Sequence, residues 1–387
     1  MLKISRLLRP FSRQFASYFF CSTSELTKNP PIYEAKHSFG QAGTLNTEIK
    51  NINLDIHLKT IWEDYAALKL YSNHANLGDF LNFTENERNC YLEDSPLPAT
   101  FEQKENSLLI AEIPEYYSLN LTNRGSVGFV KAEVSSKLCG NVKLNLLNEQ
   151  SKFFASKIKS EFFEAKIKKG NFDISTFLES AEFSLLSEAL NVNIKRLGIS
   201  HFANLELGNG ILDIGSIYVG TFTPRGRKPE ERPKVIAISN EMKGIEEISQ
   251  DLTQDIKEHN HINVTGKKLK LNVGNWQGPT VIDVEEADLN FKNYEGEKFV
   301  VKADSGEITL NLSRLGSEGL IYMNSGNLKL FIEEELKINI FSYRKKELVG
   351  ADLNFGGPNL VLYLGDNVNL TFERTKKKSF FERFSKK

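Results

Sequence analysis

The pattern of apolar and polar positions is clearest in residues 299–341, where one phrase occurs twice, twenty residues apart. Residues 305–310 read SGEITL and residues 325–330 read SGNLKL. Alternate side chains of a strand point to opposite faces, and a preceding glycine permits the positive φ of a tight corner. The alternation predicts that Ile308, Leu310, Leu328 and Leu330 face inward and that Thr309 and Lys329 face solvent.

Related phrases extend this pattern over most of the chain, with a variable period. Leu269–Leu271 precedes Leu289–Phe291 by twenty residues, and the phrase ADLNF occurs at 287–291 and 351–355. Further copies begin at Gly140, Gly170 and Gly210, and Leu370–Phe372 closes the series. A short strand cannot bury its apolar face alone, whereas stacked copies can. The pattern predicts an all-β chain, a β-solenoid (β-helix-like) of short stacked strands over 106–374. The alternative is a β-sandwich of hairpins.

The regions outside the repeat have other patterns. Residues 16–105 read as an irregular N-terminal β region, with a loop from Asn82 to Gln103. A Pro-rich charged loop at 221–234 precedes Met242, Ile245, Ile248, Leu252 and Ile256, whose spacing predicts an amphipathic helix with Asn240 as its cap. This insertion spans about 221–265, and we expect the helix to plug one end of the stack or to cover one flank.

The first fifteen residues, MLKISRLLRPFSRQF, contain Lys3, Arg6, Arg9 and Arg13 and no acidic residue. An amphipathic, Arg- and Ser-rich segment of this kind is typical of a mitochondrial transit peptide. We therefore expect a mitochondrial protein, with the matrix favoured. A secretory signal is the alternative, and under it Asn120 and Asn311, each in an N-x-S/T sequon, would be glycan acceptors.

Composition narrows the function further. The formal charge of −1 becomes about −5 without the leader, which argues against a general nucleic-acid binder. There is no apolar run of eighteen residues, so no membrane-spanning helix is expected. The basic tail at 375–387 interleaves Phe380, Phe381 and Phe384 with lysines, a pattern that allows peripheral contact with an anionic membrane.

Candidate chemistry is sparse. His259 and His261 have no further metal ligand at a familiar spacing, and 208–210 (GNG) lacks the third glycine of a dinucleotide loop and reads as a corner. Asp288, Asp304 and Asp352 lie near corresponding strands, as the acids of β-helix lyases do, but outward polar residues are expected there anyway. The three cysteines, Cys21, Cys90 and Cys139, fit neither a disulfide framework nor a zinc motif. We predict no catalytic, cofactor-binding or metal-binding residues, no cofactor and no enzymatic activity.

Two segments carry a resemblance to a known family: 113–121 (IPEYYSLNL), and 308–316 (ITLNLSRLG) with the Ser325-Gly326 turn after it. With 369–374 (NLTFER), they resemble the putative-adhesin family, a β-solenoid domain of unknown function. Within it they are similar to the eukaryotic mitochondrial branch named family with sequence similarity 185. The resemblance covers about 107–374 and departs at 221–265. It implies a solenoid and a mitochondrial address, and it supplies no catalytic residues.

These observations lead to one principal functional hypothesis. We expect a non-enzymatic, adhesin-like mitochondrial protein that binds or scaffolds an unknown protein partner and no nucleic acid. The alternatives are a secreted or surface adhesin and, behind it, a carbohydrate-active β-helix enzyme.

Overall fold

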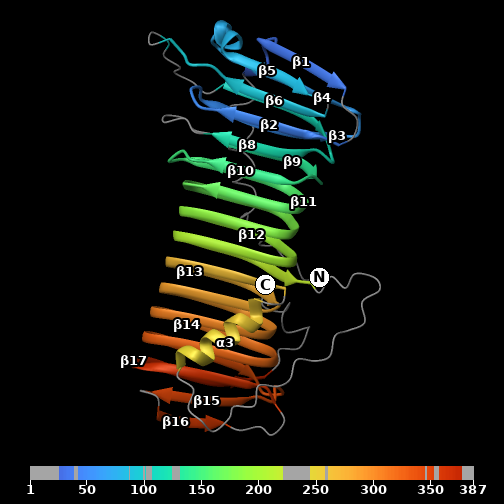
Figure 1. The fold of residues 1–387 in the computed structure, drawn as a ribbon. Helices are drawn as coiled ribbons and strands as arrows, with labels where there is room; N and C mark the ends of the chain where they lie inside the picture. The colour runs from blue at the N-terminus through green and yellow to red at the C-terminus, as the bar shows by residue number, and fades with distance from the viewer. Residues whose placement is uncertain are drawn as a thin grey trace, which may run out of the picture.

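The computed structural model describes most of the chain between residues 26 and 376. The described ranges are 26–38, 42–86, 88–98, 101, 107–123, 131–220, 245–257, 260–344, 347–352 and 357–376. Within them the protein is nearly all β. A single sheet of seventeen strands is strongly curled and is accompanied by two short helices (Figure 1). The predicted leader at 1–15 and most of the basic tail lie outside the described residues.

The N-terminal part of the sheet contains parallel and antiparallel pairs. Its elements are β1 (Tyr33–Ser38), β2 (Thr44–Ile49), β3 (Leu54–Ile61), β4 (Tyr65–Tyr71), η1 (Ala75–Phe80), β5 (Leu81–Asn86) and β6 (Asn89–Asp94). Strands β1 and β4 pair antiparallel, as do β5 and β6. The loop expected from Asn82 to Gln103 is therefore wrong for its first half, which forms this hairpin. Cys90 and Leu92 are buried at alternate positions of β6, a two-residue signal that the surrounding polar residues obscured.

From β7 (Ser107–Pro114) and β8 (Ser118–Asn123) onward, the sheet is built mainly of parallel neighbours. The next elements are β9 (Lys131–Leu138), β10 (Val142–Leu146), β11 (Ser151–Ile167), β12 (Lys169–Val219), β13 (His261–Gln277) and β14 (Thr280–Glu333). Val142 pairs with Leu119 on one side and with Phe163 on the other, so neighbours are just over twenty residues apart in sequence. Parallel neighbours at a near-constant offset fit the predicted repeat and not a sandwich of hairpins.

Each rung of about twenty residues crosses two sides of the curled sheet, which we name by their residues. The helix wall contains segments 142–146, 163–167, 202–207, 261–266, 280–284, 318–323 and 359–364, and the far wall contains 151–158, 171–178, 209–218, 268–277, 325–333 and 367–375. Figure 1 shows these rungs stacked along one axis, from blue at one end to red at the other.

The strands are longer than predicted, because extended backbone continues through many corners. Strands β12 and β14 are 51 and 54 residues long. Gly170, Gly306 and Gly326 have φ of 142°, 122° and 116°, as the corner prediction requires. Gly140 and Gly210 begin further copies of the phrase but do not adopt positive φ. Their lack of a side chain serves close stacking instead: a Cβ on Gly210 would lie 2.5 Å from the Leu190 carbonyl oxygen.

Two details of the predicted register are corrected by the structure. Leu271 pairs with Leu289, an offset of eighteen, so Leu269 is not aligned with Leu289 as the phrase suggested. Of the second ADLNF phrase the structure describes Ala351 and Asp352, which end a strand that runs antiparallel to its neighbour and do not start a parallel rung. Both errors come from matching letters where backbone pairing decides.

The inward side chains of both walls form one continuous core. Ile308, Leu310, Leu328 and Leu330 are all buried, and Lys329 is exposed, which confirms the predicted phase. Each such burial contributes about 1.5–3 kcal/mol. A phenylalanine cluster fills one part of this core, with Phe153 stacked on Phe172 at a ring-centroid separation of 5.3 Å. The abundance of Phe thus serves the interior, as expected for a β-rich core.

The C-terminal end departs from simple sequence order. The last strands are β15 (Asn339–Arg344), β16 (Glu347–Asp352) and β17 (Asn359–Thr375). Residues 359–364 of β17 lie between β14 and β15, to both of which they are parallel, and β16 pairs antiparallel with β15 (Figure 1). The β15–β16 hairpin therefore covers the last rung on the helix wall.

Helix α3 (Ile245–Lys257) confirms the helix predicted in the insertion, although its predicted cap, Asn240, lies outside the described residues. The helix lies across several rungs of β14 and does not plug an end of the stack (Figure 1). The buried side chains of Leu252 and Ile256 face the sheet.

Candidate functional site

The residues considered for chemistry from the sequence do not converge on one centre. Asp288 forms an ion pair with Lys270 at 2.9 Å, and Asp304 accepts a hydrogen bond from Asn324 at 3.1 Å. His261 stacks on Phe202, while His259 and the side chain of Asp352 lie outside the described residues. In the described ranges, no three His, Cys, Asp or Glu side chains gather as a metal-binding group.

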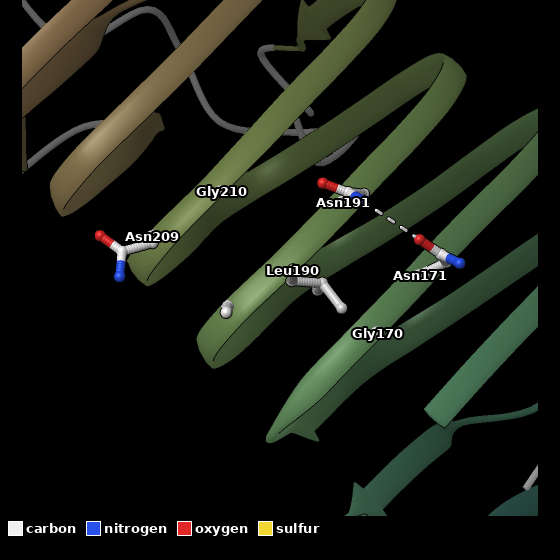
Figure 2. Close-up of a pocket in the computed structure, with 7 residues that line it drawn as sticks. Gly170, Asn171, Leu190, Asn191, Asn209 and Gly210 are labelled. Carbon is white, nitrogen blue, oxygen red and sulfur yellow. Dashed lines mark hydrogen bonds between the residues drawn. The ribbon is translucent and has the colours of Figure 1, made fainter. Parts of the chain in front are cut away.

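A shallow recess lies at a corner of β12, where three successive rungs meet (Figure 2). Its lining is made of glycines, asparagines and small apolar residues: Gly170, Asn171, Ala189, Leu190, Asn191, Asn209 and Gly210. Asn191 donates a hydrogen bond to Asn171 at 3.3 Å, so these amides hold neighbouring rungs together. The GNG phrase forms part of this corner, as expected. The recess presents amide dipoles and no titratable side chain, which makes it a surface feature of the stack and not a reaction centre.

Glu115, Lys137 and Cys139 form a polar cluster between two adjacent turns. The Glu115 carboxylate lies 2.8 Å from Lys137 Nζ and accepts a hydrogen bond from Cys139 Sγ at 3.1 Å. The hydrogen bond from Lys137 is the main cause that lowers the pKa of Glu115, against the opposing effect of burial. Burial first, and then the hydrogen bond to Glu115, raises the pKa of the Cys139 thiol. The cluster joins two turns through this ion pair and the hydrogen bond between the thiol and the carboxylate.

The principal functional feature that the sequence analysis missed is an apolar column on the outer face of the helix wall. Val281, Val300, Leu320 and Tyr363 form one buried cluster on this outer face with Leu252 and Ile256 of α3. They belong to successive rungs, so the column runs along the stack axis. Outward positions of a curled sheet are normally polar, and an apolar column there is a docking platform for an amphipathic helix.

A sequence signal for this column exists. The rung segments read FVV at 299–301, LIYM at 320–323 and LVLYL at 360–364, all without alternation. A continuous apolar run is typical of a strand that is buried on both faces. In these segments the residues next to the inward positions of the repeat are apolar as well.

Ionic contacts accompany the docked helix. Asp255 of α3 forms an ion pair with Lys298, and both side chains are largely buried. Burial raises the pKa of the nearby Glu318 carboxyl, with Lys298 opposing that rise and Asp255 adding to it. The ion pair between Asp255 and Lys298 thus ties α3 to β14 beside the apolar column.

Asparagine ladders connect rungs on the outer surfaces. Asn263 donates to Asn204 at 2.9 Å, and Asn293 donates to Asn275 at 2.7 Å. Four of the five asparagines in N-x-S/T sequons take part in such contacts: the Nδ2 atoms of Asn120, Asn263, Asn311 and Asn369 each donate to a neighbouring rung. These nitrogens are the atoms that would carry an N-linked glycan, so the sequons coincide with ladder positions.

The comparisons with known proteins give fold-level neighbours at low similarity. A putative adhesin from Bacteroides fragilis aligns with 88% of this chain and 96% of its own, at 7% identity and a TM-score of 0.28. A putative adhesin from Parabacteroides merdae aligns with 89% of this chain and 96% of its own, at 11% identity and a TM-score of 0.26. A putative lipid binding protein from Parabacteroides distasonis aligns with 88% of this chain and 96% of its own, at 10% identity and a TM-score of 0.24.

The other comparisons found no match. No protein-family profile matches the chain, and no curated protein matches it. Among the described helices, none has the length and apolar character needed to cross a bilayer.

Proposed function

We propose that this chain is a β-solenoid of the adhesin-like kind that acts without catalysis, as a binding or scaffolding protein in mitochondria. The solenoid assignment is supported by the parallel pairing of rungs, by the near-constant sequence offset, and by the shared core between the two walls. A stack of this kind holds its outer side chains at fixed spacings of about 4.8 Å, which suits recognition of extended or helical partners.

The observation that carries the binding role is the apolar column under α3. The chain uses the outer face of the helix wall to hold an amphipathic helix, through Val281, Val300 and Leu320. Earlier rungs of the same wall present exposed Leu186 and Phe202 to solvent. Helix-in-groove recognition uses apolar positions of this kind, so we infer that a protein partner contacts the wall next to α3.

The sequon asparagines support an organellar setting over a secreted one. In the secretory pathway Asn120 and Asn311 would be glycan acceptors, yet their Nδ2 atoms donate to Asn46 and to the Phe291 carbonyl oxygen across rungs. A glycan at either nitrogen would replace one of its two N–H hydrogens and add bulk beside the ladder contact. The basic, acid-free segment 1–15 supports import into mitochondria.

Site-specific photocross-linking in isolated mitochondria tests the binding role. A photoreactive phenylalanine analogue is placed at Leu186 or Phe202 on the helix wall and at Ile211 on the far wall, with the buried Leu205 as the matched control. We expect one discrete cross-linked product from the helix-wall positions and none from Leu205. The absence of any discrete product from Leu186 and Phe202 would refute the binding role of this wall.

Import tests the address separately. Replacement of Arg6, Arg9 and Arg13 by Glu removes the positive charges of the leader, and we expect loss of mitochondrial import. A protein with these changes that still reaches mitochondria would show that this segment is not the address. Glycosylation of Asn120 or Asn311 in cells would favour the secreted alternative.

A further inference from the structure

The C-terminal end of the stack has an open strand edge on the far wall. Residues 359–364 of β17 are covered by β15 on the side away from β14. The second half of β17, residues 367–375, pairs with 325–333 of β14, and no described strand pairs with Asn369–Glu373 on the opposite side. The last rung is therefore covered on one wall and open on the other.

Apolar side chains mark the open half as an interaction surface. Leu370 and Phe372 pair with Leu328 and Leu330, whose side chains lie in the core, so they point toward the interior side of the stack. They are nevertheless 36% and 39% exposed, because no further rung covers them. An edge strand with core-phase apolar residues is a template for another strand.

Two contacts near the beginning of the edge show which backbone groups face its open side. Arg344, the last residue of β15, donates hydrogen bonds to the carbonyl oxygens of Asp366 and Val368, the latter at 2.9 Å. Since alternate residues of a strand direct their N–H and C=O groups to the same side, Leu370 and Phe372 direct theirs to this side as well. The open edge thus continues an edge that already accepts a parallel strand over its first half.

The surroundings decide which occupant fits. The β15–β16 hairpin extends two strands beyond β17 on the helix wall, so the far wall has a step beside it. A second copy of the chain, paired edge to edge through the same residues, would have to accommodate this two-strand projection from both copies. A single extended segment fits the step without that requirement.

We propose that residues 369–373 of β17 bind an extended segment of another polypeptide by strand addition, and that the segment presents apolar side chains at alternate positions. The segment would cover Leu370 and Phe372 and receive backbone hydrogen bonds from them, the mode of recognition known as β-augmentation. The inference is independent of the outer surface of the helix wall, because it concerns the end of the stack.

A peptide that copies the natural strand neighbour of β17 serves as the probe. A fluorescent synthetic peptide of residues 325–333, SGNLKLFIE, has the required alternation and pairs with the other edge of β17 in the fold. Fluorescence anisotropy with the full chain measures binding, and a scrambled peptide of the same composition is the control. Hydrogen-exchange mass spectrometry then locates the site, with increased protection expected within 367–376.

Matched variants distinguish specific binding at the edge from nonspecific adsorption of the peptide. Leu370→Lys and Phe372→Lys place charge in the interior phase, and we expect at least tenfold weaker binding. Thr371→Lys adds the same charge on the outward face, and we expect less than a twofold change. All three positions are exposed, so circular dichroism should show unchanged folding.

Other outcomes would overturn the proposal. The proposal fails if Thr371→Lys weakens peptide binding as much as the other two variants do. It also fails if the scrambled peptide binds equally well, or if the peptide gives no hydrogen-exchange protection at 367–376. Peptide binding that appears only in a variant truncated after Lys376 would show that residues 377–387 of the chain itself occupy the edge. A concentration-dependent dimer that Leu370→Lys abolishes would identify a second copy.

Discussion

A single methyl group at Gly306 tests the stacked arrangement most directly. Gly306 has a φ of 122°, and a Cβ built on it would lie 2.0 Å from the Ala287 carbonyl oxygen of the rung before. Gly326 repeats the arrangement one rung later, where the same atom would lie 2.0 Å from the Gly306 oxygen. Replacement by alanine therefore adds left-handed backbone strain and forces two rungs apart.

The magnitude follows from these two effects. Positive φ costs an L-residue about 1–2 kcal/mol, and each stacking hydrogen bond that is weakened costs about 0.5–1.5 kcal/mol. We expect Gly306→Ala to lower the free energy of unfolding by about 3 kcal/mol. With an unfolding entropy of about 2.1 cal/mol/K per residue, this corresponds to a melting temperature about 4 °C lower.

Gly198 provides the matched control, because it also lies within a rung strand. A Cβ there would meet the flexible Glu179 side chain at 3.3 Å and the Leu178 carbonyl oxygen at 4.0 Å, and φ is not positive. We expect Gly198→Ala to change the melting temperature by less than about 1 °C, since alanine lowers the entropy of the unfolded chain. Thr309→Val, on the outward face, should likewise be mild beside Gly306→Val. Equal shifts for the two Gly→Ala variants in thermal unfolding followed by circular dichroism would refute the assigned corners.

Three further predictions concern the helix, the polar cluster and the ladders. Ile256→Ala should release α3, seen as faster hydrogen exchange over 245–257, whereas the exposed Lys257→Ala should not; unchanged exchange in Ile256→Ala would contradict the docking. Glu115 has a lowered pKa in the fold, so its contribution to stability is present above its ordinary pKa of 4.5 and is lost as pH falls below that value. Between pH 5 and 3 (about two units around that pKa), the urea midpoint of Glu115→Gln should therefore fall less steeply than that of the parent chain. Parallel curves of urea midpoint against pH for the two proteins would exclude a contribution of Glu115 to this pH dependence. Asn293→Ala should cost about 1–2 kcal/mol in the same unfolding assay, because it breaks hydrogen bonds to Asn275 and Glu295; a neutral result would mean that the ladder adds no stability.

The sequence predicted those features whose signal is local and periodic. Alternation around Ile308 and Leu328 gave the inward phase, and spacings of three and four gave α3, because each element buries one face. Register was less predictable, because inserted or deleted residues at corners change the offset without changing the phrase. Leu271 therefore pairs with Leu289, although Leu269–Leu271 and Leu289–Phe291 looked equivalent.

Features that depend on distant partners were not predictable in the same way. The β5–β6 hairpin is rich in polar residues, and its buried side chains are Leu81 in β5 and Cys90 and Leu92 in β6. The position of β17 between β14 and β15 follows from chain reversal through β15 and β16, which no local pattern encodes. The apolar column could have been found, because the outward Val300 and Leu320 interrupt alternation, but its partner helix lies about fifty residues earlier in the sequence.

This distance in sequence gives α3 a particular physical role. In a stacked repeat each rung contacts only its neighbours, so stability is close to a sum of adjacent interfaces, and an end can open without affecting the middle. Helix α3 comes from the link before β13, yet its Leu252 and Ile256 share one buried cluster with Val281, Val300, Leu320 and Tyr363, which belong to four successive rungs. It therefore couples four rungs in one step, next to the end where β17 is half covered. A structure held in this way keeps its terminal rungs in place without a complete cap, and the edge at Leu370 and Phe372 can stay open while the rest of the stack remains closed.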